Sequence, residues 1–545
     1  MNRSFLALLA AIVPGPIAAQ DAPSPPPKLV IVISVDQFSG DLFGQYRRQF
    51  TDGFARLMEG AVFPSGYQSH AATETCPGHS TITTGARPGR TGIIANEWID
   101  LRSTRPDKTV YCSEDATVPG SSSTNFTVSD KNLLVPTLGE RMKATNPASR
   151  VVSVAGKDRS AVMMGGHKVD ELWWWDGKTY RSYADRAIPP AVAAAKAAVA
   201  ARLEQAQPAL SVPPHCSARD RPIDIGGGKT VGTKHFARAA GDALAFRASP
   251  EFDSATLALA AALIRDMELG TGPATDIITI GASATDYVGH TYGAGGVEMC
   301  VHMQALDRAL GDLLRAVDAM GVDYVVAMTA DHGGLDLPER TSQNAAPGGR
   351  ADPALNAKTI GTAIAARLGL KGQLLWGSNL GEMWIDPTLS KKQRAKVLAE
   401  SVRAFRAHPQ VQAVFTAAEL AATPSPSGPP DSWTLLQRAR ASYNAERSGD
   451  FVVVLKPRIT PLVEAGKPFV ASHGSFWDYD RRVPILFWRK GMTGFEQPLS
   501  VETVDIAPTL AALIGLPLKP GDMDGRCLDL QVGAGSTCGA AGDQQ

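Results

Sequence analysis

The sequence lacks an excess of charge of either sign, because 54 Lys and Arg residues balance 54 Asp and Glu residues over 545 positions. Proteins that bind nucleic acid or an anionic membrane surface through a broad electrostatic field carry a basic excess. We therefore expect no nucleic-acid binding. Internal repeats and long low-complexity tracts are also missing. The hydrophobic fraction of 44% and the charged fraction of 20% are those of an ordinary globular protein, and the length suits one large domain with insertions.

Apolar runs long enough to span a bilayer, about 20 residues, are absent too. The apolar run at 5–13 is shorter, follows Arg3 and precedes Ala18-Ala19, which is the pattern of a cleaved secretory signal. We expect a signal peptide at residues 1–19, a Pro-rich spacer at 20–27, and a periplasmic or secreted protein without a membrane anchor.

Cysteine is scarce, with six residues in the chain, and their spacing matches no zinc-finger pattern. In an exported protein they are expected to form disulfides. Many pairings are open to six cysteines. We expect sequential pairing, since the last two would close a short C-terminal loop: Cys76–Cys112, Cys216–Cys300 and Cys527–Cys538.

What the chain does have is an alternation of short Val- and Ile-rich runs with longer helical segments. The runs predict buried parallel strands at 28–35, 150–155, 275–280, 323–330, 451–455 and 483–488. Helices are predicted at 135–145, 189–206, 254–268, 297–319, 391–406 and 503–515. This alternation indicates an α/β fold, with a mostly parallel central sheet and helices on both faces. We expect one domain over 28–530, insertions at about 160–250 and 340–470, of which at least one caps the active-site crevice, and a tail at 531–545.

Six Asp and His residues stand out because most of them follow these strands. They are Asp36, Asp286, His290, Asp331, His332 and His473. Side chains at the carboxyl ends of sheet strands converge on the crevice where open α/β sheets bind ligands. Three Asp and three His suit two divalent ions with three protein ligands each, leaving positions open for chemistry.

A second informative stretch runs from Thr73 to Gly85. Pro77 suits the first turn of a helix, which places Thr75 at a helix N-terminus, where amide groups favour an anion. A hydroxyl there, beside a metal ion, can act as a nucleophile. The alternative is that Thr75 only caps the helix, a common role for threonine.

The motifs occur in the order seen in the alkaline phosphatase superfamily, and the chain resembles its nucleotide pyrophosphatase/phosphodiesterase branch. The motifs are Asp36, Thr75-Cys-Pro-Gly-His79, Gly92-Ile-Ile-Ala-Asn96, Asp286-Tyr-Val-Gly-His290, Asp331-His-Gly333 and Ser472-His-Gly474. Lys157 and Arg159 form a Lys-x-Arg pair, as in the single-chain, Thr-dependent alkaline phosphatases of the PafA/PhoK type. The resemblance covers about residues 28–530 and implies an alkaline-phosphatase-like fold.

The resemblance implies two zinc sites and a phosphoric monoester hydrolase acting on small phosphorylated substrates. One site would use Asp286, His290 and His473; the other would use Asp36, Asp331, His332 and the hydroxyl of Thr75. Thr75 would attack phosphorus and form a phosphothreonine. Mn²⁺ or Co²⁺ suit similar ligands, and an exported protein can also carry structural Ca²⁺, for which the sequence indicates no ligands. We expect a monomer.

Three further residues are expected to bind the phosphoryl group. Asn96 would donate a hydrogen bond to a phosphoryl oxygen. Lys157 and Arg159, two positions apart after a predicted strand, would point to one face and bind the two extra oxygens of a monoester dianion. The alternative for this pair is a solvated basic turn, as surface Lys and Arg usually are.

Other polar residues carry weaker expectations. His79 is expected to form a hydrogen bond within its helix, Trp173-Trp-Trp175 to pack in the interior, and Asp478 and Asp480 to orient His473. The main competing function is a phosphodiesterase or nucleotide pyrophosphatase on the same scaffold. Two others are a phosphonate or sulfate hydrolase, which Cys76 beside Thr75 brings to mind, and an inactive metal-retaining binding protein.

Overall fold

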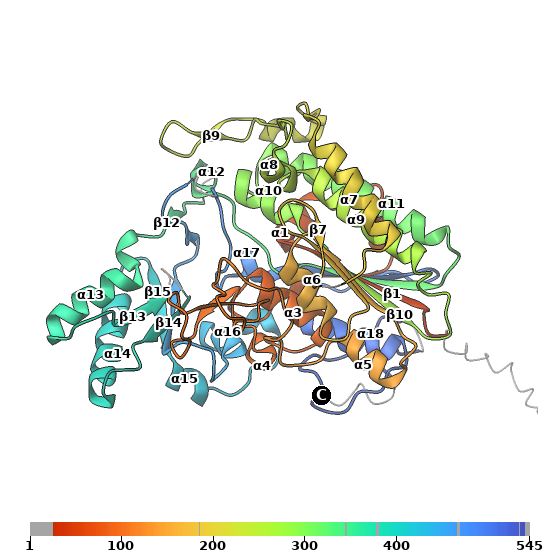
Figure 1. The fold of residues 1–545 in the computed structure, drawn as a ribbon. Helices are drawn as coiled ribbons and strands as arrows, with labels where there is room; N and C mark the ends of the chain where they lie inside the picture. The colour runs from red at the N-terminus through yellow and green to blue at the C-terminus, as the bar shows by residue number, and fades with distance from the viewer. Residues whose placement is uncertain are drawn as a thin grey trace, which may run out of the picture.

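The structure is a computed structural model that describes residues 25–184, 186–343, 346–377, 381–465, 469–532 and 535–539. The expected signal peptide and most of the expected spacer lie outside the described residues. A ten-stranded sheet forms the centre of the molecule (Figure 1), in the order β19-β2-β18-β11-β1-β10-β5-β6-β7, with β20 beside β2. Its strands are β1 (Leu29–Val35), β2 (Ala61–Tyr67), β5 (Val151–Ala155), β6 (Glu171–Trp175), β7 (Tyr180–Arg181), β10 (Asp276–Ala282), β11 (Tyr324–Thr329), β18 (Arg482–Arg489), β19 (Phe495–Glu496) and β20 (Val501–Glu502).

The middle of this sheet is parallel, as predicted. β1 pairs in parallel with β10 and β11, and β10, β5 and β6 continue in the same direction. β18 is the exception among the predicted strands, because it runs antiparallel to both β11 and β2. The apolar run at 483–488 correctly indicated a buried strand, but burial on both faces does not fix strand direction, so the expectation of a parallel strand there was wrong.

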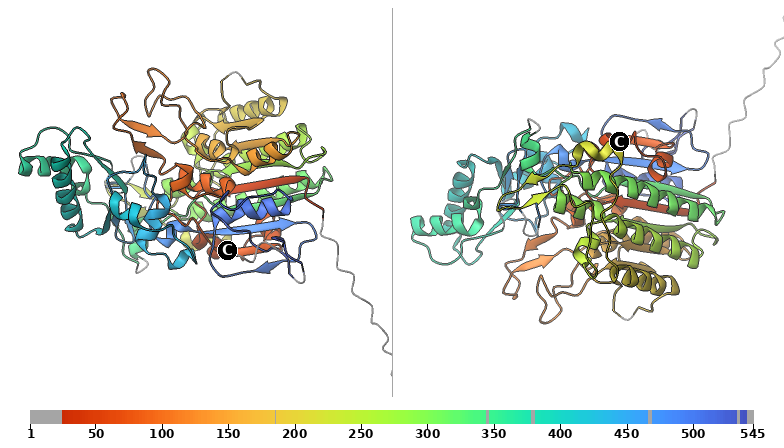
Figure 2. Two further views of the ribbon diagram at one scale, coloured as in Figure 1. Left: turned by 90° about the horizontal axis from the view of Figure 1, so that it is seen from below. Right: turned by 90° about the horizontal axis from the view of Figure 1, so that it is seen from above.

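Helices cover both faces of the sheet, and the alternation of β1 side chains shows how. Ile31 and Ile33 pack with one layer, which contains α1 (Gly40–Tyr46), α2 (Gly53–Leu57), α7 (Pro190–Leu203), α9 (Pro250–Asp266) and α11 (Val297–Asp318). Val30 and Val32 pack with the opposite layer, which contains α3 (Thr75–Thr84), α5 (Leu138–Thr145), α6 (Asp158–Gly165) and α18 (Ile506–Leu513). Figure 2 shows the two layers from below and above.

A smaller antiparallel sheet lies at the far end of the molecule (Figure 1). Its order is β13 (Leu375–Gly377), β14 (Gly381–Ile385), β16 (Phe451–Leu455), β15 (Val411–Thr416). Together with α13 (Ala357–Leu368) and α14 (Lys391–Arg406) it buries a core of its own. The predicted strand at 451–455 is therefore real, but it belongs to this sheet and is antiparallel to both neighbours, contrary to expectation.

The region at about 160–250, expected as an insertion, begins within the main sheet. β6 and β7 extend that sheet at one edge, and Trp173, Trp174 and Trp175 are buried there, as expected for a structural role. The remaining short elements are β3 (Glu97–Ile99), β4 (Thr109–Tyr111), β8 (Ile223–Asp224), β9 (Thr230–Val231), β12 (Gly349–Arg350), β17 (Ile459–Thr460), α4 (Pro88–Thr91), α8 (Ala243–Arg247), α10 (Ala284–Tyr292), α12 (Pro338–Gln343), α15 (Ala417–Ala422), α16 (Leu435–Ser442) and α17 (Asp478–Arg481).

The three predicted disulfides are present: Cys76–Cys112, Cys216–Cys300 and Cys527–Cys538. Among the described residues, every helix is too short or too polar to cross a membrane.

Candidate active site

The predicted donors meet at the carboxyl ends of the three central strands. Asp36 follows β1 directly, Asp331 and His332 follow β11, and α10, which follows β10, carries Asp286 and His290. Because β1 lies between β10 and β11, the ends of these strands adjoin. His473 reaches the same place from the long loop before α17.

The donor atoms fall into two adjoining groups. Asp286 Oδ1 lies 3.2 Å from His290 Nε2 and 3.4 Å from His473 Nε2. In the second group, His332 Nε2 lies 3.3 Å from Asp331 Oδ2 and 3.5 Å from Asp36 Oδ1. The rings of His332 and His473 stack with centroids 3.7 Å apart, which brings the two groups side by side.

Each of the three histidines uses Nδ1 for a backbone carbonyl. The acceptors are Ala471 O for His290 (2.7 Å), Gly333 O for His332 (2.8 Å) and Thr73 O for His473 (2.8 Å). A neutral imidazole that donates from Nδ1 presents the lone pair of Nε2, which is how a metal-binding histidine is usually held.

This arrangement fits divalent cations. A nitrogen lone pair that faces a carboxylate oxygen at such distances repels it unless a cation binds both. Within the described residues, Asp286 Oδ1, Asp331 Oδ2 and His332 Nε2 are buried without a hydrogen-bond partner. Burial also lowers the pKa of His332 to about 3, which keeps this imidazole neutral and able to bind a metal.

Lys157 lies between the two groups. Its Nζ is 2.6 Å from Asp36 Oδ2 and 2.6 Å from Asp286 Oδ2. Burial opposes the ammonium charge, but these two carboxylates outweigh it and hold the pKa of Lys157 above its usual value. For Asp36, burial and the neighbouring Asp331 raise the pKa, while Lys157 lowers it.

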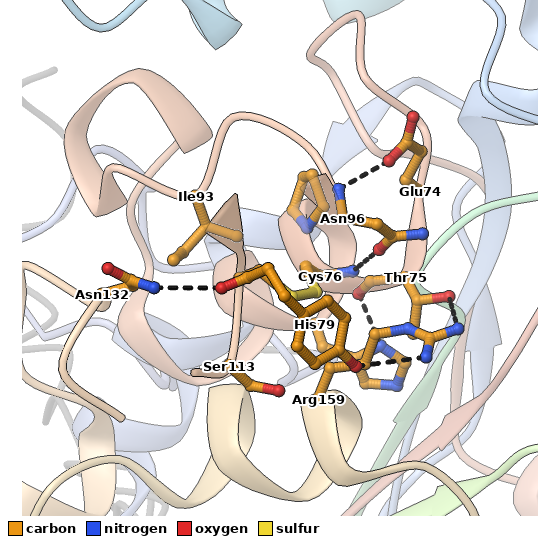
Figure 3. Close-up of a disulfide and its surroundings, with 12 residues drawn as sticks. Glu74, Thr75, Cys76, His79, Ile93, Asn96, Ser113, Asn132 and Arg159 are labelled. Atoms are coloured by element: carbon orange, nitrogen blue, oxygen red, sulfur yellow. Dashed lines mark hydrogen bonds between the residues drawn. A yellow bond between two sulfur atoms is a disulfide. The ribbon is translucent and has the colours of Figure 1, made fainter. Parts of the chain in front are cut away.

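Thr75 is the first residue of α3, where the amide groups of the first turn and the helix dipole favour negative charge. Figure 3 shows its surroundings. Its Oγ1 lies 3.5 Å from Lys157 Nζ and 3.5 Å from Arg159 Nη2. The hydroxyl is buried between two cations, and an oxygen that gains negative charge would be stabilised there.

The local structure of Lys157 and Arg159 differs from the extended segment that was predicted. Lys157 is the extended N-cap of α6, while Arg159 already lies in the first turn of that helix. Alternation along a strand therefore does not explain their common direction. Their side chains converge because the turn from β5 into α6 faces the N-terminus of α3.

Asn96 is fixed by two hydrogen bonds (Figure 3). Its Oδ1 accepts from Cys76 N at 2.8 Å, and its backbone N–H donates to Glu74 Oε2 at 2.6 Å. Since Oδ1 is occupied, the amide nitrogen remains the group that can donate to a ligand.

Two neighbouring residues depart from or extend the sequence analysis. His79 Nδ1 forms the expected hydrogen bond within its helix, to Thr75 O at 2.8 Å, and also lies 3.1 Å from Asp331 Oδ2. Asp478 and Asp480 do not orient His473: Asp480 accepts from Ser475 N and Asp478 pairs with Arg481. The loop carbonyl of Thr73, which no sequence pattern singles out, takes that role.

The site opens into a pocket of about 660 Å³. Asn96, Arg159 and His473 line its inner part, and Glu382 and Trp384 of the small sheet line another wall. The small sheet thus contributes to the active-site rim, where a cap was expected. The disulfide partner of Cys76 also bears on the rivals, because a sulfatase needs that position as a free, modifiable residue.

The sequence profile of the type I phosphodiesterase / nucleotide pyrophosphatase family matches residues 30–476, and the chain belongs to this family. The chain is 56% identical over 526 residues to alkaline phosphatase PhoK of a Sphingomonas species, a match that covers 95% of this chain and 94% of that protein. It is 46% identical to alkaline phosphatase PhoD of Zymomonas mobilis, over 94% of this chain and 89% of that protein.

The fold is that of the crystal structure of alkaline phosphatase PafA, with a TM-score of 0.78, 24% identity and coverage of 92% of this chain and 98% of that one. The chain is accordingly an enzyme of the phosphoric monoester hydrolase class, with an alkaline-phosphatase-like fold.

Proposed function

We propose that the protein hydrolyses phosphate monoesters with Thr75 as the nucleophile. The observation that carries this proposal is the hydroxyl of Thr75 at the N-terminus of α3, 3.5 Å from both Lys157 and Arg159. A phosphoryl group at this hydroxyl would meet both cations, the helix dipole and the amide of Asn96. Phosphoryl transfer depends mainly on such positioning and charge stabilisation.

Two zinc ions fit the donors, one held by Asp286, His290 and His473 and the other by Asp36, Asp331, His332 and the hydroxyl of Thr75. When bound, such ions activate oxygen nucleophiles and stabilise the charge on the attacking and leaving oxygens. The mixed Asp and His ligands, and the orientation of each imidazole by a backbone carbonyl, support this assignment.

The reaction proceeds in two displacements. Thr75 Oγ1 forms a bond to phosphorus while the ester P–O bond breaks and the alcohol leaves. Water then attacks the phosphothreonine, frees Thr75 and releases phosphate, with net retention at phosphorus. Asn96 donates from its amide nitrogen to a phosphoryl oxygen, and Arg159 holds a second oxygen.

Selectivity for monoesters follows from charge. A monoester dianion has one more negative charge than a diester anion, and Lys157 and Arg159 supply cations on that side. Within the described residues Arg159 makes no ion pair, so its guanidinium is free to bind phosphate. Lys157 acts as a point charge held between Asp36 and Asp286.

The test compares p-nitrophenyl phosphate with bis-p-nitrophenyl phosphate as substrates at alkaline pH. We expect a strong monoester preference in the wild type and a loss of monoester kcat/KM of about 100-fold or more in Lys157→Ala/Arg159→Ala. Diester hydrolysis should change far less. Arg102→Ala, which removes a guanidinium with a 76% exposed side chain, is the control.

A phosphodiesterase or nucleotide pyrophosphatase is the second candidate, since the matching family profile bears that description. A wild type that prefers the diester, with a ratio that the double variant leaves unchanged, would establish this candidate and exclude the first.

We further infer export through an N-terminal signal peptide, with small phosphorylated compounds as substrates and a monomeric enzyme. The three disulfides support export, because such bonds persist in oxidising compartments.

A further inference from the structure

We propose that Tyr111 is a positioning residue that fixes the guanidinium of Arg159 against the nucleophile and thereby sets the preference for monoesters. This inference rests on the proposed function and extends it to a residue outside every motif of the sequence. Tyr111 ends β4, whose hairpin with β3 lies over the N-terminus of α3 and contributes to the pocket wall.

The hydrogen bonds of Arg159 carry the argument. Its Nη2 donates to Thr75 Oγ1 at 3.5 Å and its Nη1 donates to the hydroxyl of Tyr111 at 3.4 Å. Within the described residues these are the two partners of the guanidinium, and its Nε has none although it is buried. Tyr111 is thus the group that restrains Arg159 from the side opposite to the nucleophile.

The hydroxyl of Tyr111 has a defined orientation. It donates its single proton to Asp158 Oδ1 at 2.8 Å, so its lone pairs remain to accept from Arg159. Burial raises the pKa of Tyr111 above its usual value, so the hydroxyl keeps this proton at alkaline pH. Asp158 precedes Arg159 in α6, and the three residues form a closed arrangement.

Tyr111 is itself held in place. Its backbone N–H donates to Glu114 Oε1 at 2.8 Å, and its carbonyl accepts from Asn132 Nδ2 at 3.1 Å. The next residue, Cys112, donates from its backbone to Asn96 O at 2.9 Å and is bonded through its sulfur to Cys76. Because Cys76 follows Thr75, one disulfide ties the strand that carries Tyr111 to the helix that carries the nucleophile (Figure 3).

The chemical consequence concerns orientation rather than charge. A guanidinium binds two phosphoryl oxygens only when its plane faces them. Without the hydroxyl of Tyr111, Arg159 keeps its charge but can rotate about its side-chain torsions. The loss should be felt by a dianion, which needs the second contact, and hardly by a diester.

The experiment uses Tyr111→Phe, which removes one oxygen and keeps the ring. We expect kcat/KM for p-nitrophenyl phosphate to fall about tenfold, the loss of one hydrogen bond to a charged group, and inhibition by inorganic phosphate to weaken by a similar factor. Hydrolysis of bis-p-nitrophenyl phosphate and the melting temperature should stay the same. Tyr46→Phe is the matched control, because Tyr46 is buried and its hydroxyl has no hydrogen-bond partner in the described structure.

Two further variants sharpen the result. Asp158→Ala, which frees the hydroxyl of Tyr111, should shift the monoester-to-diester ratio in the same direction. In the background of Arg159→Ala, Tyr111→Phe should have no additional effect, since the group that it positions is gone.

Equal losses on both substrates, or additive losses with Arg159→Ala, would show that Tyr111 acts on general stability and would overturn the inference. An unchanged ratio in both Tyr111→Phe and Asp158→Ala would also overturn it. A wild type without monoester preference would instead refute the proposed function itself, so the two failures are distinguishable.

Discussion

At the scale of single residues, the hydroxyl of Thr75 is the group on which the proposed chemistry depends. Thr75→Ala should lower phosphatase activity by at least about 1,000-fold, because the attacking oxygen is gone. Bound metal, measured by elemental analysis, should remain, since six other donors are untouched. Thr75→Ser is the matched control and should keep measurable activity. A Thr75→Ala enzyme with more than a tenth of wild-type activity would rule out the phosphothreonine route.

The metal donors could be read from the sequence because each lies in or near a strand end or in a short motif. His290 and His473 are examples, and the structure places both beside Asp286. Tyr111 could not be found in this way, because it lies in an irregular segment and acts on Arg159 through a hydrogen bond that only the tertiary fold creates. The role expected for Asp480 was wrong for a similar reason: nearness in sequence to His473 did not determine which group its imidazole meets.

At the scale of elements, the apolar runs located the strands within a few residues, but the pattern carries no information on direction. β16 and β18 are as rich in Val, Ile and Leu as β1, yet both are antiparallel to their neighbours. A fully buried strand looks the same in the sequence whichever way its neighbour runs. The membership of β16 in a second sheet likewise depends on the helices that enclose it.

The contact between α5 and the turn after α6 predicts a pH effect on stability. His167 Nδ1 lies 3.0 Å from Glu140 Oε1, and this carboxylate holds the pKa of His167 above its usual value. An imidazole with a raised folded pKa contributes stability in full below its unfolded pKa and loses it as the pH rises through the folded pKa. His167→Gln should therefore lower stability by about 0.5–1 kcal/mol near pH 6, and by less near pH 9.

Thermal or urea unfolding of both proteins at the two pH values measures this difference. Salt at 1 M should reduce it near pH 6, because the pair is half-exposed and screened by ions. A deficit of equal size at both pH values would assign the effect to packing and exclude the charged pair.

A disulfide between elements gives another prediction. Cys216 of the 3₁₀ segment Pro214–Arg219 is bonded to Cys300 of α11, across 84 positions, while Cys527 and Cys538 are separated by 11. Since the entropy of the unfolded chain falls more when a longer loop is closed, Cys216→Ser/Cys300→Ser should cost about 2–5 kcal/mol. The matched pair Cys527→Ser/Cys538→Ser should cost less. Denaturant unfolding ranks the two, and the reverse order would contradict the argument.

At the scale of the whole molecule, the site combines three buried carboxylates with Lys157 as a cation among them, so bound metal should contribute to stability. Removing it with a chelator should abolish activity and lower the free energy of unfolding by about 4 kcal/mol or more, as expected for a ligand present far above its Kd. Calorimetry before and after adding zinc back measures the effect. Thr75→Ala should respond in the same way, because its other donors remain, and a melting temperature indifferent to the chelator would contradict the two-ion site.

The donors are distributed along most of the chain, from Asp36 after the first strand to His473 in a loop near the last long strand. A ribosome makes the first donor long before the last, so a nascent or truncated chain holds only part of the set. Turnover then reports that synthesis has been completed and that distant segments have come together. Nicked or unfinished copies would be silent, which makes activity a direct measure of the fraction of chains that have matured.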